Sequence, residues 1–292
     1  MTKKKILITG KHSYIGVAVK AWLSVEQGSC SVEAISVKDS SWKMKDFSEF
    51  DTVVHVAGIA HSDTRNATAD MKTTYYQVNK ELTIEVAKKA KKEGVRQFVF
   101  MSSMIVYGEA ASLGIKKRIT EKTAPQPANF YGDSKWQAEC GLVALKADDF
   151  KVAIIRPPMV YGRGSKGNYP RLAKLAKWIP LFPNVDNERS MIHIDNLCEF
   201  IRLIIEHVDD GVFHPQNAHY VKTSDLVMAV ATLHGKQLRL TRFFNPLLKL
   251  LTKRVGAINK VFGNFSYDMA LSEYKMTYQV RDFQESLELT EK

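Results

Sequence analysis

The chain has 292 residues, 45% of them hydrophobic and 25% charged, which is the composition of a globular protein with a large core. It has no apolar run long enough for a membrane-spanning helix, and its three cysteines (Cys30, Cys140, Cys198) lack the spacing of a disulfide framework or a metal site. The net charge of +11 comes without any nucleic-acid-binding signature. We therefore expect a cytoplasmic protein with no metal and no nucleic-acid partner.

The first half of the chain alternates short apolar segments with amphipathic ones. Strands are predicted at 5–9, 32–37, 52–57, 97–101 and 151–156, and helices at 14–23, 75–92 and 131–145. Such alternation predicts an α/β fold with a Rossmann-type, doubly wound parallel sheet.

After residue 160 the pattern loosens, with glycines and prolines around further helices at 196–207 and 223–234. We expect a first domain at 1–160 and a smaller C-terminal substrate-binding cap at 161–292, partly interleaved with the sheet. The cap is expected to cover the C-terminal edge of the strands, where open α/β sheets bind ligands.

A glycine-bounded turn directly follows the first strand. Gly10 and Gly16 flank Ser13, Tyr14 and Ile15, and the amides of this turn can bind a pyrophosphate at the start of the next helix. Ser13 stands where a middle glycine is usual. The turn predicts binding of a dinucleotide, and residues 1–160 are then an NAD(P)-binding domain.

The end of the second strand leaves the choice between NAD and NADP open. Asp39 can hold a ribose diol, as NAD requires, and Lys38 can hold the 2′-phosphate of NADP. We expect NAD. Further cofactor contacts are predicted at an adenine edge, at small residues that end the third strand and at the end of the fifth: Asp46, Phe47, Ala57, Gly58 and Pro157.

Tyr131 and Lys135 lie one helical turn apart, so their side chains share a helix face. An ammonium beside a phenol is expected to lower the pKa of Tyr131 below its ordinary value of about 10. The upstream Ser103 can hydrogen-bond the same substrate oxygen. The three residues predict a site that moves a proton on and off an alcohol or sugar oxygen while a cofactor moves the hydride.

These motifs together resemble the extended short-chain dehydrogenase/reductase superfamily, and within it the NAD-dependent epimerase/dehydratase family of nucleotide-sugar enzymes. The resemblance covers nearly the whole chain. It rests on Gly10-x-x-Ser13-x-x-Gly16, on Ser103 ahead of Val106-Tyr107-Gly108, on Tyr131-x-x-x-Lys135, and on the segments 156–162 and 189–196.

The resemblance implies a role for each site residue. Tyr131 is the base and acid at the sugar hydroxyl, Lys135 tunes Tyr131 and holds the nicotinamide ribose, and Ser103 hydrogen-bonds the reacting oxygen. Arg189 contacts the diphosphate or the uridine ribose of a nucleotide sugar. The substrate loop contains Lys166 and Asn168, and a homodimer is implied through the helices at 75–92 and 131–145.

The two residues after Ser103 narrow the reaction. Sugar 4,6-dehydratases carry an Asp-Glu pair there, whereas this chain has Met104 and Ile105, which cannot transfer a proton. The leading hypothesis is a 4-epimerase of a UDP-hexose or UDP-N-acetylhexosamine, acting through a transient 4-keto intermediate. The alternatives are an NAD(P)H-dependent 4-ketoreductase of a nucleotide-linked 4-keto-6-deoxy sugar, an epimerase of a polyprenyl-diphosphate-linked sugar, and a non-catalytic cofactor-binding protein.

The stretch between Asp225 and Asp268 contains no acid, while lysines and arginines recur through 236–260. Within it, residues 243–254 combine apolar and basic side chains. Such a segment suits peripheral contact with a membrane or with a lipid-linked sugar. An ordinary helix packed on the cap is the interpretation that we favour from the sequence.

Overall fold

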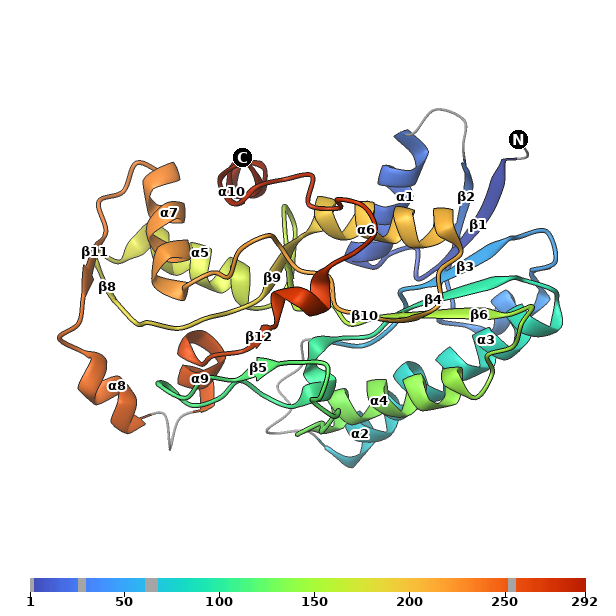
Figure 1. Cartoon of the computed structure of the whole chain (residues 1–292), viewed down its shortest axis with the longest axis horizontal. Helices are drawn as coiled ribbons and strands as arrows, with labels where there is room; N and C mark the ends of the chain where they lie inside the picture. Colours follow the sequence, from blue (N-terminus) through green and yellow to red (C-terminus); the bar gives the residue numbers. More distant parts are fainter. Residues whose placement is uncertain (1–2, 26–29, 61–67, 252–255) are drawn as a thin grey trace.

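The structure is a computed structural model and describes residues 3–25, 30–60, 68–251 and 256–292. Figure 1 shows a parallel sheet between two layers of helices at one end of the molecule, with short strands and helices grouped at the other. Within the described residues, no helix is long and apolar enough to span a membrane.

The central sheet has six parallel strands in the order β10-β6-β4-β3-β1-β2. The strands are β1 (Lys4–Thr9), β2 (Cys30–Ile35), β3 (Thr52–His55), β4 (Gln97–Met101), β6 (Lys151–Ile155) and β10 (Gly211–Phe213). Because β2 and β3 pair with opposite sides of β1, the order in which the strands are added to the sheet reverses at β1. Ligands of such sheets bind beyond the C-terminal ends of the strands at this switch point.

Helices cover both faces of this sheet (Figure 1). One face packs against α1 (Tyr14–Val25) and α6 (Ile194–His207), and the other against α3 (Leu82–Lys92) and α4 (Phe130–Val143). Alternate side chains of β1 pack against the two helix layers, since Ile6 and Ile8 belong to one core and Leu7 to the other. Burial on both faces explains why the strands are apolar throughout, and it confirms the predicted fold class.

The helix predicted at 75–92 begins earlier and is interrupted. It consists of α2 (Ala69–Tyr76), one π-helical turn η3 (Gln77–Glu81) and α3. A π turn inserts one residue into the helical repeat and is frequent at functional sites. It places Asn79 in a fully buried position.

The cap has its own core among α5 (Asn168–Trp178), α7 (Thr223–Leu233) and α10 (Phe283–Glu291). Three small sheets accompany these helices, pairing β7 (Met159–Tyr161) with β9 (Met191–His193), β8 (Leu181–Pro183) with β11 (Arg239–Thr241), and β5 (Arg118–Ile119) with β12 (Ser266–Tyr267). Two short helices, α8 (Asn245–Leu251) and α9 (Gly256–Phe262), follow β11. Because β10 and α6 belong to the central layers, residues after 160 contribute to both parts; the boundary at 160 stays a prediction.

His55 at the end of β3 is completely buried and neutral. Its Nδ1 lies 2.7 Å from Thr9 Oγ1 and its Nε2 lies 3.1 Å from Thr83 Oγ1. Burial lowers its pKa to about 3, and the nearby Lys135 ammonium adds to the effect. The unfolded chain therefore binds a proton near pH 6.5 that the folded protein does not accept until about pH 3.

The stability contributed by His55 should be complete above pH 6.5 and should fall as the pH drops toward 3. Between pH 6.5 and 5 the loss is about 2 kcal/mol in the free energy of unfolding. We expect His55→Asn to be less stable at pH 7 but to lose less stability on acidification. Urea unfolding at pH 7, 6 and 5 measures both slopes, and parallel slopes would contradict this assignment.

Candidate active site

The glycine turn lies at the switch point of the sheet. Gly10 has φ +106°, and a Cβ added there would lie 2.9 Å from the backbone nitrogen of Ala57. The N–H of Gly10 donates to the carbonyl of Ile35 at 2.9 Å, which ties the turn to the end of β2. Only glycine allows the ends of β1, β2 and β3 to meet so closely.

Ser13 does not disturb the start of α1. Its Oγ accepts a hydrogen bond from the N–H of Gly16 at 3.0 Å, and a Cβ added to Gly16 would lie 2.5 Å from the Gly10 carbonyl. The Tyr14 hydroxyl is buried without a hydrogen-bond partner in the described part of the chain, and burial raises its pKa. The turn therefore offers a ligand the backbone amides at the beginning of α1, including that of Ile15.

The residues after β2 lie on the surface. Lys38 and Asp39 are both exposed, and Asp39 accepts a hydrogen bond from Ser41 N–H at 2.9 Å as the cap of η1 (Ser40–Met44). The hydrogen bonds from Ser41 lower the pKa of Asp39. A carboxylate has further acceptor positions, so this cap does not exclude a contact with a ribose.

Asp46 and Phe47 lie elsewhere. Phe47 is fully buried in the core, and its backbone N–H donates to Glu93 Oε2 at 2.7 Å. Glu93 follows α3 just before β4 begins, whereas Gly10 follows the end of β1. In a parallel sheet Glu93 therefore lies at the N-terminal ends of the strands and Gly10 at their C-terminal ends. The structure does not bring Asp46 and Phe47 to the glycine turn.

Local geometry brings Tyr131 to Ser103. Asn129 caps α4 by accepting the Gly132 N–H at 3.0 Å, which places Tyr131 in the first turn. A Cβ on Gly132 would lie 2.8 Å from the Ile105 carbonyl, so glycine allows α4 to contact η4 (Met104–Tyr107). Ser103 caps η4, and its side chain hydrogen-bonds Tyr131.

Lys135 is buried at the same edge of the sheet. Its Nζ donates to the Met101 carbonyl at 2.9 Å and lies 4.6 Å from the centre of the Phe100 ring. A Cβ added to Gly58 would lie 3.1 Å from this Nζ, so the ammonium borders the exposed residue that follows β3. Burial lowers the pKa of Lys135 to about 8.

The expected lowering of the Tyr131 pKa is wrong for the protein by itself. Burial raises this pKa to about 12, although the hydrogen bond from Ser103 acts in the opposite direction. The main reason is the loss of water around the buried phenol, and the neighbouring Tyr75 raises the Tyr131 pKa further. At neutral pH the phenol therefore carries its proton.

Asn79 connects the loop after β3 to the helix of Tyr131. Its Oδ1 accepts the Ile59 N–H at 2.8 Å, and its Nδ2 donates to the Ile59 carbonyl and to Ser134 Oγ, each at 3.1 Å. Ser134 Oγ donates to the Tyr131 carbonyl at 2.9 Å. The π turn thus fixes the position of Tyr131 relative to the loop that contains Gly58. The periodicity of the sequence did not indicate this π turn.

Pro157 and Ala57 complete this edge. Pro157 is buried directly after β6, and its carbonyl accepts the Met104 N–H at 2.9 Å. The segment holding Ser103 is thereby fixed to the end of β6. The structure brings together the ends of β1, β3, β4 and β6 with the start of α4. The predicted catalytic residues, the glycine turn, Ala57, Gly58 and Pro157 lie there, whereas Lys38 and Asp39 follow β2 on the surface and Asp46 and Phe47 lie elsewhere.

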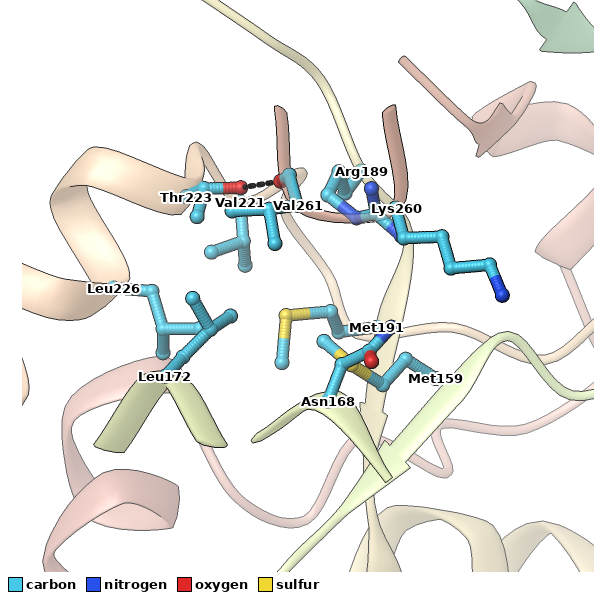
Figure 2. Close-up of a pocket in the computed structure, with 10 residues that line it drawn as sticks. All are labelled: Met159, Asn168, Leu172, Arg189, Met191, Val221, Thr223, Leu226, Lys260 and Val261. Carbon is cyan, nitrogen blue, oxygen red and sulfur yellow. Dashed lines mark hydrogen bonds between the residues drawn. The ribbon is translucent and has the colours of Figure 1, made fainter. Parts of the chain in front are cut away.

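Arg189 and Asn168 line one small pocket in the cap. Figure 2 shows the two side chains on either side of it, with Lys260 beside Arg189. The other lining residues are Met159, Leu172, Met191, Val221, Thr223, Leu226 and Val261. Lys166 is exposed and does not line this pocket, so the structure separates it from the other two predicted substrate residues.

The Arg189 guanidinium suits an anion. Its Nη1 donates to the Gly263 carbonyl at 3.1 Å, and burial lowers its pKa to about 10. No salt bridge joins Arg189 to an acid within the described residues, although a buried cation is normally paired. Lys260 and Thr223 were not predicted as site residues; only the tertiary fold brings α9 and α7 to Arg189.

The chain is similar to several known proteins. The model of the NAD dependent epimerase/dehydratase family matches residues 6–218. A protein of Vibrio cholerae named UDP-glucose 4-epimerase is 35% identical over 228 residues, covering 75% of this chain and 68% of that protein.

Two further proteins are similar. An Escherichia coli O157:H7 protein named N-acetyl-alpha-D-glucosaminyl-diphospho-ditrans,octacis-undecaprenol 4-epimerase is 33% identical over 61% of this chain and 52% of its own length. The crystal structure of a UDP-glucuronic acid 4-epimerase from Bacillus cereus in complex with NAD has a TM-score of 0.71 at 17% identity. It covers 98% of this chain and 95% of that one. At this identity the likeness shows the fold.

Proposed function

Because the chain belongs to the NAD-dependent epimerase/dehydratase family, we propose that it is an NAD-dependent 4-epimerase of a UDP-hexose or UDP-N-acetylhexosamine. The observation that carries this proposal is the meeting of three features at one sheet edge. These are the Gly10 turn, the hydrogen-bonded pair of Ser103 and Tyr131, and the buried Lys135 ammonium.

The edge fits a dinucleotide. The Gly10 turn has no space for a side chain, α1 begins directly after this turn at the switch point, and Lys135 borders Gly58. Gly10, Ser13, Ile15, Gly16, Ala57 and Lys135 would hold the cofactor. When bound, NAD accepts the hydride of C4 and returns it.

Tyr131 and Ser103 handle the proton at the reacting oxygen. Ser103 hydrogen-bonds the sugar O4, and Tyr131 takes the O4 proton as C4 is oxidised and returns it when the ketone is reduced. With a pKa of about 12, the phenol of Tyr131 by itself favours donating a proton over accepting one. Its action as a base requires positive charge near the phenol, for which the Lys135 ammonium, charged below about pH 8, is the nearest candidate on α4.

The pocket of Arg189 supports a diphosphate-linked substrate. A guanidinium without an acidic partner among the described residues suits a diphosphate, and Lys260 also lines this pocket. Two relatives are named as 4-epimerases, one of a UDP-sugar and one of a diphosphate-linked lipid sugar. The diphosphate is common to both, so Arg189 fits either carrier, and we propose the nucleotide sugar.

Epimerisation leaves the cofactor unchanged, and this gives a direct test. Protein purified without added nucleotide should release NAD⁺ on denaturation and should interconvert UDP-glucose and UDP-galactose, or their N-acetyl forms, without added cofactor. The Tyr131→Phe protein, prepared in the same way, is the control for contaminating epimerase. Turnover that consumes stoichiometric NADH or NADPH with a keto sugar would instead establish the ketoreductase.

Arg189→Ala should weaken substrate binding more than it slows the reaction. A charge-assisted hydrogen bond to a diphosphate contributes about 1.5–3 kcal/mol, so KM should rise about 10–100-fold with kcat nearly unchanged. Arg163→Ala is the matched control because Arg163 is exposed and outside the pocket. An unchanged KM in the Arg189 variant would remove this residue from the substrate site.

We also propose the homodimer that the family resemblance implies, formed by α2 and α3 together with α4. The outer side of α4 leaves Val143 52% exposed, and Cys140 on the same helix is also exposed. Burying such a patch between two copies is favourable. Light scattering of the protein and of Val143→Lys tests the contact.

A further inference from the structure

The outer end of the cap carries several large apolar side chains in water. Phe243 is 82% exposed, Leu250 71% and Leu247 55%, all on or beside α8. Trp178, at the end of α5, is 79% exposed, and Leu181 of β8 is 43% exposed. In Figure 1, α8 lies below β8 and β11, at the end of the molecule away from the central sheet.

Exposed cations neighbour several of these side chains. Leu181 pairs in the small sheet with Arg239, and the exposed Arg242 directly precedes Phe243. We call the set Leu181, Arg239, Arg242, Phe243, Leu247, Lys249 and Leu250 the α8 surface. The sequence has no acid between Asp225 and Asp268, and the described acid near Arg242, Asp186, forms a salt bridge with Lys222 at 2.8 Å. Lys253 and Arg254 lie outside the described residues.

The helix packs on the cap with one side only. Leu248 joins the cap core, and Phe244 is partly buried, which agrees with the packed helix favoured from the sequence. Phe243, Leu247 and Leu250 point away from that core and remain exposed. The segment is therefore amphipathic, with a packed side and an apolar outer side bordered by arginine and lysine.

This combination identifies the occupant of the surface. An aromatic and leucine patch bordered by cations matches the interfacial region of an anionic bilayer, where aromatic rings and aliphatic chains enter the headgroup boundary and cations contact phosphates. A second copy of the same surface would gather Arg239 and Arg242 of both copies in one contact without an acid on the surface to balance them, and this repulsion disfavours self-association there.

We propose that the α8 surface docks the protein on anionic membranes as a peripheral contact. Phe243, Leu247 and Leu250 enter the interface, while Arg239 and Arg242 contact lipid phosphates. The contact does not depend on the reaction proposed above, because none of these residues belongs to the catalytic edge or lines the Arg189 pocket. Membrane binding and epimerase activity can therefore be tested separately.

Flotation of the full-length protein with vesicles tests the proposal. Binding is expected to vesicles of phosphatidylcholine with phosphatidylglycerol at low salt, and to be weak with phosphatidylcholine alone. Arg239→Gln with Arg242→Gln should lower partitioning about 30-fold, from a contribution of about 1 kcal/mol for each cation. Phe243→Ser with Leu250→Ser should lower it about tenfold or more.

Matched variants separate this surface from overall charge and hydrophobicity. Lys88→Gln with Lys92→Gln removes the same charge from exposed positions of α3, and Met44→Ser removes a 91% exposed apolar side chain from η1. Both controls should float like the wild type. Equal losses in the controls, no flotation of the wild type at low salt, or a dimer that the α8-surface variants dissociate would each overturn the proposal.

Discussion

Replacing Tyr131 by Phe is expected to lower kcat about 10²–10⁴-fold while the protein stays folded, because the substitution removes only the group that transfers the proton. The ring remains in place, since it packs edge-on against Tyr75 with ring centres 5.9 Å apart. Steady-state kinetics with a UDP-sugar and thermal unfolding measure the two effects together.

Tyr76→Phe is the matched control for this loss. The Tyr76 hydroxyl donates at 2.6 Å to Asp133, which lies on the helix of Tyr131, so its removal deletes a similar hydrogen bond away from Ser103. We expect kcat to stay within a few-fold of the wild type, in line with about 1 kcal/mol for an ordinary hydrogen bond. If Tyr131→Phe and Tyr76→Phe reduce kcat alike, Tyr131 is not the proton-transfer group.

Glu139→Ala is expected to have the largest effect on stability, about 3–5 kcal/mol in the free energy of unfolding. Glu139 is 1% exposed and forms a salt bridge with Arg156, which is 5% exposed. Removing the carboxylate leaves a buried guanidinium without its partner. The loss can be measured by urea unfolding at neutral pH.

Two comparisons test the cause of that loss. Glu85→Ala, which breaks a half-exposed pair with Lys43, should cost about 1 kcal/mol or less. Replacing Glu139 and Arg156 together by Met should recover part of the loss, because that buried pair then leaves no charge unpaired. A double variant as unstable as Glu139→Ala would mean that packing, rather than the unpaired charge, dominates.

The same ion pair supports the catalytic edge. Glu139 accepts a hydrogen bond from Ser102, the neighbour of Ser103, and its charge raises the pKa of Lys135 against the effect of burial. Arg156 donates to the Tyr107 hydroxyl, which lies 2.8 Å from His214 Nε2. Loss of Glu139 should therefore lower the Lys135 pKa below about 8 as well as the stability.

The sequence by itself predicted five of the six strands of the central sheet and the glycine turn, but not β10, and it proposed the catalytic residues. Apolar runs mark strands buried on both faces, and short-range spacing places Gly10 after β1 and Tyr131 one turn before Lys135. These features depend on neighbouring residues, so local patterns contain them. The resemblance then indicated Arg189 and Asn168, which the structure places in one pocket.

Only the tertiary structure decided the surroundings of these residues. Phe47 is a core residue away from the glycine turn, and Lys166 lies outside the Arg189 pocket. Phe243, just before α8, is exposed to water. The Tyr131 pKa is raised because its phenol is buried, whereas the spacing of Tyr131 and Lys135 in the sequence predicted the opposite shift. Burial and electrostatic environment are set by segments far apart in the chain, and no local pattern encodes them.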